Sequence, residues 1–140
     1  MLVGTLFIAR HGFAQDHHHG HENHEETQSL IAIMQGMEKN LYKLTSAILI
    51  ENFPAITSAA HDIAYHPGIA KEDLHHLFER LGPLKEDFIE CDNAVHDLAR
   101  DISKAGEQEN MDLVLEKYSA MLVKTVECHR EYNPKTGDKE

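Results

Sequence analysis

Residues that favour turns and sheets are scarce in this sequence. Its 140 residues include no tryptophan, only eight glycines and four prolines, and few runs of β-branched side chains. From residue 27 onward, Leu, Ala, Glu, Lys and Met dominate, and these residues favour helix. The composition therefore predicts a single helical domain, which at this length buries enough surface to hold its own core.

Basic residues are also scarce. Lys and Arg number 13 against 24 Asp and Glu, which gives a formal net charge of −11 with His neutral. Nucleic acids and anionic membranes bind basic patches, so the charge argues against both as partners. No apolar run reaches the roughly 20 residues that a membrane span needs, and we expect no membrane insertion.

Catalytic motifs are missing as well. The sequence has no glycine-rich phosphate loop after a strand, no Gly-x-Ser-x-Gly turn and no carboxylate pair that its pattern places in a pocket. We therefore predict a binding or carrier protein, with no enzymatic activity.

The beginning of the chain resembles an export signal. Residues 1–14 contain a short apolar run, and Gly12 and Ala14 stand three positions and one position before a plausible cleavage site. Arg10 and His11 interrupt the apolar region and no basic residue precedes it, so the segment is either a truncated signal or not a signal. We expect export to the periplasm.

Residues 15–26 form a polar segment that cannot bury apolar surface, and we expect it to be a disordered tail. Gly20 breaks the pattern of an expression tag, which favours a native metal-binding tail. Such a tail binds zinc, copper or nickel weakly and with little selectivity. Its histidines are His17, His18, His19, His21 and His24.

The segment 27–133 contains apolar residues spaced by three and four, the pattern of amphipathic helices. It predicts an all-α, antiparallel up-down-up-down four-helix bundle with a short extra helix between the second and third long helices. The expected helices cover about 28–51, 54–65, 71–81, 84–105 and 110–132. The first is capped by Thr27 or Asn23, the fourth stops at Gly106, and residues 134–140 are a polar tail.

Helix lengths in this bundle place Met34 and His129 at the same end. Met34 precedes the first interhelical turn by about 17 residues and His129 follows the last one by about 20, so at about 1.5 Å per residue their heights agree within a turn. The same counting puts Cys91 opposite about Met121, roughly 10 Å from Cys128. We therefore predict no disulfide between the two cysteines.

The end of the last helix, Glu127-Cys128-His129-Arg130-Glu131-Tyr132, resembles that of cytochrome c-prime and its low-spin relatives. In that family a Cys-x-x-Cys-His motif opens the last turns, and an aromatic residue follows three positions after the His, as Tyr132 does here. The chain is also similar to the periplasmic b-type bundle cytochrome, whose ligand Met is followed by Asn-Leu at six and seven residues. Met34 is followed by Asn40-Leu41 at the same offsets, and the resemblance covers about residues 28–133.

The resemblance implies haem, a redox partner protein, and electron transfer or haem-ligand chemistry, and it allows a homodimer. Met34 and His129 would be the axial ligands, with Phe88 as a cavity wall. The family motif requires Cys where this chain has Thr125. Haem is then held non-covalently, or attached through Cys128 alone, or replaced by another ligand.

The alternative is a periplasmic non-haem protein that binds or buffers copper or zinc on the same fold, since thioether, imidazole and thiolate groups are soft metal ligands. A third interpretation is an interaction module with no ligand, in which seam methionines only fill the core. The candidate metal ligands are Met34, Met37, His66, His96, Cys128 and His129.

Overall fold

The structure, a computed structural model, describes residues 27–132. Its long helices are α1 (Leu30–Leu49), α2 (Phe53–Ala64), α4 (Lys85–Glu107) and α5 (Met111–Tyr132), with α3 (Lys71–Leu81) between the second and third of them. Two short strands, β1 (Thr27–Gln28) and β2 (Gly68–Ile69), and a 3-10 turn at Gly82–Leu84 complete the elements. The predicted all-α four-helix bundle with an extra helix is confirmed. The predicted export signal, the His-rich tail and the C-terminal tail lie outside the described residues.

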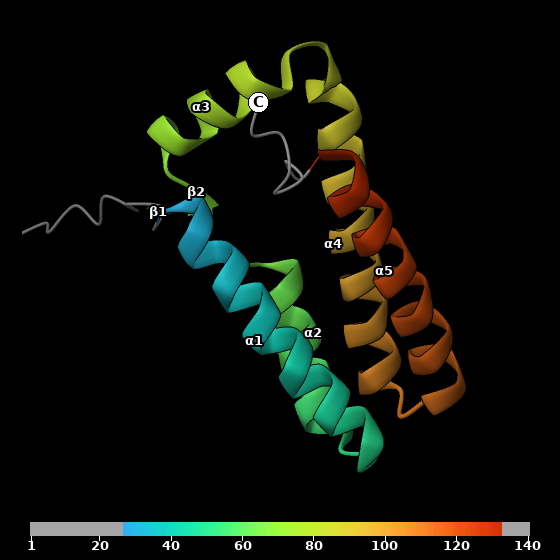
Figure 1. The fold of residues 1–140 in the computed structure, drawn as a ribbon. Coiled ribbons are helices and arrows are strands. Elements are labelled where there is room, and N and C mark those ends of the chain that lie inside the picture. The colour runs from blue at the N-terminus through green and yellow to red at the C-terminus, as the bar shows by residue number, and fades with distance from the viewer. Residues whose placement is uncertain (1–26, 133–140) are drawn as a thin grey trace, which may run out of the picture.

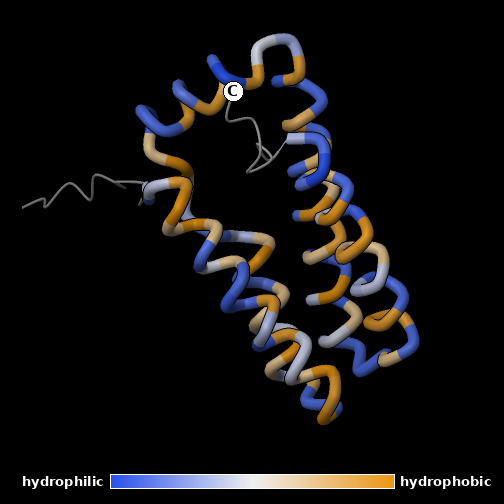
Figure 2. Tube along the Cα trace, viewed as in Figure 1, coloured by the Kyte–Doolittle hydropathy of each residue, from blue (hydrophilic) through white to orange (hydrophobic). Residues whose placement is uncertain are grey.

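The helices form two antiparallel hairpins, α1–α2 and α4–α5, and α3 lies across one end of the molecule (Figure 1). The hairpins pack mainly through α2 against α4. Hydrophobic and hydrophilic positions alternate along the helices, as amphipathic segments require (Figure 2). The core gathers small and branched residues where these helices meet, and its most deeply buried side chains are Leu44, Ile56, Ile102 and Val114.

Both hairpins close with the same turn. Glu51 and Glu109 adopt a positive φ, 53° and 52°, in the residue position after each helix's C-cap. The following residues, Asn52 and Asn110, donate their backbone N–H back into the preceding helix, which is the Schellman pattern. Each Asn side chain then caps the next helix by accepting a backbone N–H three residues on.

Two details of the first and fourth helices differ from the sequence prediction. Ser29, not Thr27, caps α1 by accepting the N–H of Ala32, because Thr27 lies in β1. Helix α4 continues through Gly106 to Glu107. Gly106 is buried against α2, where a Cβ would lie 2.6 Å from Thr57 Oγ1. This glycine therefore allows two helices to approach closely and does not terminate one.

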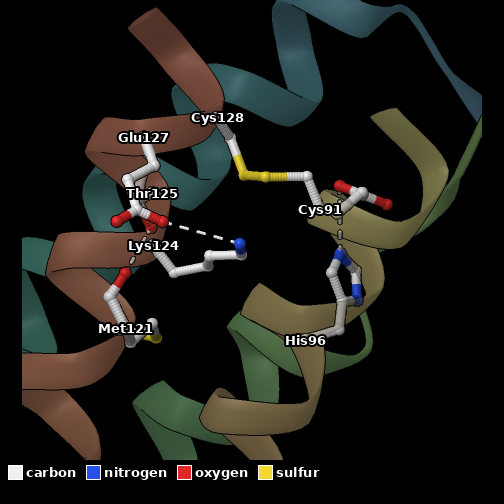
Figure 3. Close-up of a disulfide and its surroundings, with 8 residues drawn as sticks. Cys91, His96, Met121, Lys124, Thr125, Glu127 and Cys128 are labelled. Carbon is white, nitrogen blue, oxygen red and sulfur yellow. Dashed lines mark hydrogen bonds and ion pairs between the residues drawn. A yellow bond between two sulfur atoms is a disulfide. The ribbon is translucent and has the colours of Figure 1, made fainter. Parts of the chain in front are cut away.

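The predicted absence of a disulfide is wrong. Cys91 of α4 and Cys128 of α5 are bonded, with Cα atoms 6.0 Å apart (Figure 3), a separation well within the range for disulfides. Cys91 lies 16 residues before Glu107, the end of α4, and Cys128 lies 17 residues after Met111, the start of α5, so the two cysteines face each other. The predicted partner of Cys91, Met121, was seven residues in error.

Helix α3 is attached to both hairpins. The Asp73 carboxylate in its first turn accepts the backbone N–H of Leu30 at 2.8 Å, and β1 pairs with β2 in parallel just before it. At the other end, Lys85 Nζ of α4 lies 4.5 Å from the centre of the Phe78 ring. These contacts hold α3 over the end of the bundle where α1 begins and α5 ends.

Candidate functional site

A cavity of about 510 Å³ lies at the end of the bundle that α3 covers. Helices α1, α2, α3, α4 and α5 all contribute side chains to it, and most of these are apolar. Pockets of about 300–1,000 Å³ with apolar walls and a few polar groups are typical of small-molecule and cofactor sites. The cavity is therefore the leading candidate for a ligand site.

The cavity lies where α1 and α5 diverge. Nearer the interhelical turns these helices are joined by a 2.7 Å hydrogen bond between the hydroxyls of Thr45 and Tyr118. Every α1 residue in the cavity lining precedes Thr45, and every α5 residue in it follows Tyr118. Toward α3 the two helices separate in Figure 1, and side chains from both line the space.

Met34 and His129 line this cavity from opposite helices, α1 and α5. Phe88 of α4 and Met37 of α1 lie in the same lining. Met34 is 42% exposed and His129 is also exposed, so both residues are accessible from solvent. The sequence prediction that these residues lie at one end of the bundle agrees with their place in the cavity.

An aromatic pair forms the wall on the α4–α5 side. The rings of Phe88 and Tyr132 meet edge to face, with centroids 5.6 Å apart. Desolvation raises the pKa of the Tyr132 hydroxyl, and the charges of Asp87, Glu131 and Glu90 raise it further. Tyr132 therefore presents a neutral phenol to the cavity at neutral pH.

The disulfide lies beside the cavity, because Cys128 is one of its lining residues. Its sulfur is bonded to Cys91, so this cysteine has no thiol for haem attachment and no thiolate for a metal in the oxidised chain. The roles predicted for Cys128 as a single attachment point or thiolate ligand are thereby corrected for this state. Thr125, at the position of the missing cysteine, also lines the cavity and donates its hydroxyl to the carbonyl of Met121 at 2.8 Å (Figure 3).

Three charged residues also line the cavity: Glu38 of α1, Arg80 of α3 and Asp92 of α4. Arg80 supplies a guanidinium group that can bind a carboxylate through two hydrogen bonds. The sequence did not identify Arg80 or Leu77 as site residues. Their only sequence signal is that they lie three residues apart on one face of an amphipathic helix.

The candidate metal ligands divide into two groups. Met34, Met37, Cys128 and His129 line the cavity, whereas His66 and His96 do not and instead meet each other. Within residues 27–132, no group of three or more His, Cys, Asp or Glu side chains is arranged to hold a metal ion. The candidate metal ligands named from the sequence therefore do not form one site. The tail histidines lie outside the described residues.

The fold and cavity define the chain as an all-α four-helix bundle with a ligand-sized apolar cavity at one end. None of the helices within residues 27–132 is long and apolar enough to cross a membrane. Comparisons with protein-family models, with curated proteins and with solved structures give no match. The resemblance to the cytochrome c-prime group thus rests on the short motifs around Met34 and His129.

Proposed function

We propose that this protein binds haem non-covalently in the end cavity and acts as a carrier in electron transfer or haem-ligand binding, not as an enzyme. The observation that supports this proposal is the shared cavity lining. Met34 and His129 reach one apolar cavity from opposite helices. A thioether and an imidazole are a known axial pair for haem iron.

The other lining residues fit the same ligand. Phe88 and Tyr132 offer an aromatic wall for a flat apolar ring system, and Arg80 offers a guanidinium for a carboxylate substituent. Bound haem would supply one-electron chemistry, and the chain's part is to bind it, orient it and restrict the access of water. With Cys128 in a disulfide, attachment through a thioether bond is not part of the proposal.

The disulfide supports the proposed location. Disulfides persist in oxidising compartments such as the bacterial periplasm and are rare in the cytosol. The bridge between Cys91 and Cys128 thus agrees with the export expected from residues 1–14. In that compartment the carrier would exchange electrons with a redox partner protein.

The test is reconstitution of the oxidised full-length chain with haem. We expect one equivalent to give a Soret band with low-spin features. Met34→Ala and His129→Ala should each convert the spectrum to high spin and weaken binding at least tenfold. Met111→Ala on α5 and His61→Ala on α2, away from the cavity lining, are matched controls that should leave both unchanged.

The proposal fails if no stoichiometric Soret band forms, or if both ligand variants keep the wild-type spectrum and affinity. Circular dichroism of each variant must show that the helices are retained. If Met34→Ala or His129→Ala loses helix, the proposal is judged on the variant that stays folded.

A second candidate is copper binding in the same cavity. Two thioethers and an imidazole, those of Met34, Met37 and His129, line it together, and soft ligands of this kind suit Cu(I). Titration of the chain with Cu(I) under a competing chelator tests this use. Tight binding that Met37→Leu abolishes, in a chain that takes up no haem, would favour copper over haem.

A further inference from the structure

His66 and His96 meet outside the cavity, at the end of α2. Their Nε2 atoms are 3.2 Å apart, and their rings are inclined at 68° with centroids 4.8 Å apart. His66 follows the C-cap of α2, and His96 projects from the middle of α4. The His96 side chain is only 15% exposed.

The second nitrogen of each ring fixes its tautomer. His66 Nδ1 lies 2.7 Å from the carbonyl oxygen of Pro67, and His96 Nδ1 lies 3.0 Å from that of Ala64. A carbonyl oxygen only accepts hydrogen bonds, so both Nδ1 atoms carry hydrogen and donate it. In two neutral rings, both Nε2 atoms then present bare lone pairs to each other. A positive centre between them, a proton or a metal ion, is needed to offset that repulsion.

The geometry suits a metal ion. Two imidazole nitrogens bound to zinc at about 2.0–2.1 Å with tetrahedral angles lie about 3.3 Å apart, close to the observed 3.2 Å. Histidines that bind metals commonly donate their other ring N–H to a backbone carbonyl or a carboxylate, which orients the ring. Both rings already make that hydrogen bond.

A carboxylate stands next to the pair. Asp92 Oδ1, one turn earlier on α4, lies 3.7 Å from His96 Nε2. This separation is longer than the roughly 3.3 Å expected between two atoms bound to one tetrahedral ion. It agrees with the absence of an assembled three-residue group in the described chain. A small rotation of the half-exposed Asp92 side chain would bring its oxygen to the same ion, and water would complete the coordination.

We propose that His66 and His96 form a two-nitrogen anchor for a divalent transition-metal ion of the zinc class, with Asp92 as a third ligand recruited on binding. Neither histidine lines the cavity, so Zn²⁺ can bind the pair whether or not haem is present. The metal would join the end of α2 to the middle of α4. Asp92, which also lines the cavity, would link the two sites.

The experiment uses the full-length oxidised chain with its tail histidines changed to Gln, namely His17, His18, His19, His21 and His24, so that the tail does not contribute. Zn²⁺ affinity is measured by competition with a chromophoric chelator. We expect one equivalent to bind. His66→Gln and His96→Gln should each weaken it by at least the tenfold that losing even an outer-shell partner costs, and Asp92→Asn should weaken it less.

His61→Gln is the matched control, because His61 is an exposed histidine of α2 whose ring packs on Tyr65. It should leave Zn²⁺ binding unchanged. A measurement without site variants guards against misfolding: Zn²⁺ should shift the imidazole NMR signals of His66 and His96 and not those of His61. Unchanged signals from the pair, or binding that survives both pair variants, would overturn the proposal and leave a shared proton as the positive centre. Failure of haem reconstitution would not affect this result.

Discussion

Reduction of the disulfide should destabilise the chain strongly. The bridge joins residues 37 positions apart. The loop-entropy relation for a cross-link of that span gives about 4 kcal/mol at 25 °C. Domains of this kind have net stabilities of about 5–15 kcal/mol, so the bridge supplies a large share of the total.

Urea unfolding followed by circular dichroism measures this loss in oxidised and reduced protein. With a slope of about 2 kcal/mol per molar urea, reduction should lower the midpoint by about 2 M. Reduction leaves both side chains in place, so the difference reports the cross-link and not a core cavity. The double variant Cys91→Ala/Cys128→Ala is the control, and its midpoint should not respond to reductant.

Two results would refute the reasoning. One is an unreduced native protein whose two cysteines both react with iodoacetamide after unfolding, since this would mean that no bridge forms. The other is a midpoint that reduction leaves unchanged. The first result would also return Cys128 to the set of available metal or haem ligands.

Four further substitutions test a helix contact, a turn and a hydrogen bond, and urea unfolding measures the effect of each on stability. Gly106→Ala should lower the free energy of unfolding by about 1–3 kcal/mol, because the new Cβ meets Thr57. Gly36→Ala, in an open helical position, should raise it by about 0.5–1 kcal/mol. Equal effects of the two substitutions would contradict the close approach of α2 and α4. Glu109→Gly should stabilise by about 0.5–1 kcal/mol by relieving the positive φ, and a loss would contradict the turn. Tyr118→Phe should cost about 1 kcal/mol by removing the hydrogen bond to α1, and no change would show that this bond adds nothing.

Residues close together in the sequence were enough to predict the helix bounds. The extra helix was predicted at 71–81 and is found at Lys71–Leu81, because Gly82-Pro83 ends it whatever its surroundings. Asn52 and Pro54 likewise mark the start of α2 by cap chemistry and by the fixed φ of proline. Such signals depend on the residue and its neighbours in sequence, so periodicity and caps suffice.

Those local signals could not predict the register of α4 against α5. Gly106 has the composition of a helix stop, but its role is set by Thr57, nearly fifty residues earlier in the chain. Only tertiary packing distinguishes a glycine that ends a helix from one that admits a neighbouring helix. The predicted stop at 105 instead of Glu107 accounts for only part of the seven-residue difference between Met121, the predicted neighbour of Cys91, and Cys128, the observed one.

The candidate site was predicted in part. Counting residues along the helices placed Met34 and His129 at one end, and both line the cavity. The meeting of His66 with His96 could not be counted in that way, because it depends on where α2 ends beside α4. The contribution of Arg80 depends on how α3 is attached at Asp73, which no local pattern specifies.

The short length of α2 explains the positions of the cavity and of the His66–His96 pair. It has 12 residues against 23 in α4, so at about 1.5 Å per residue it is about 16 Å shorter. The carbonyl of its last residue, Ala64, meets His96 near the middle of α4, so helix α2 does not extend along the first half of α4. The cavity occupies that half under α3, and the disulfide joins α4 to α5 there, where α2 packing is missing. His66 and His96 lie where α2 ends beside α4, at the limit of the cavity farthest from α3. A metal ion bound there would hold α2 to α4 at that limit, while Met34 and His129 line the cavity from α1 and α5.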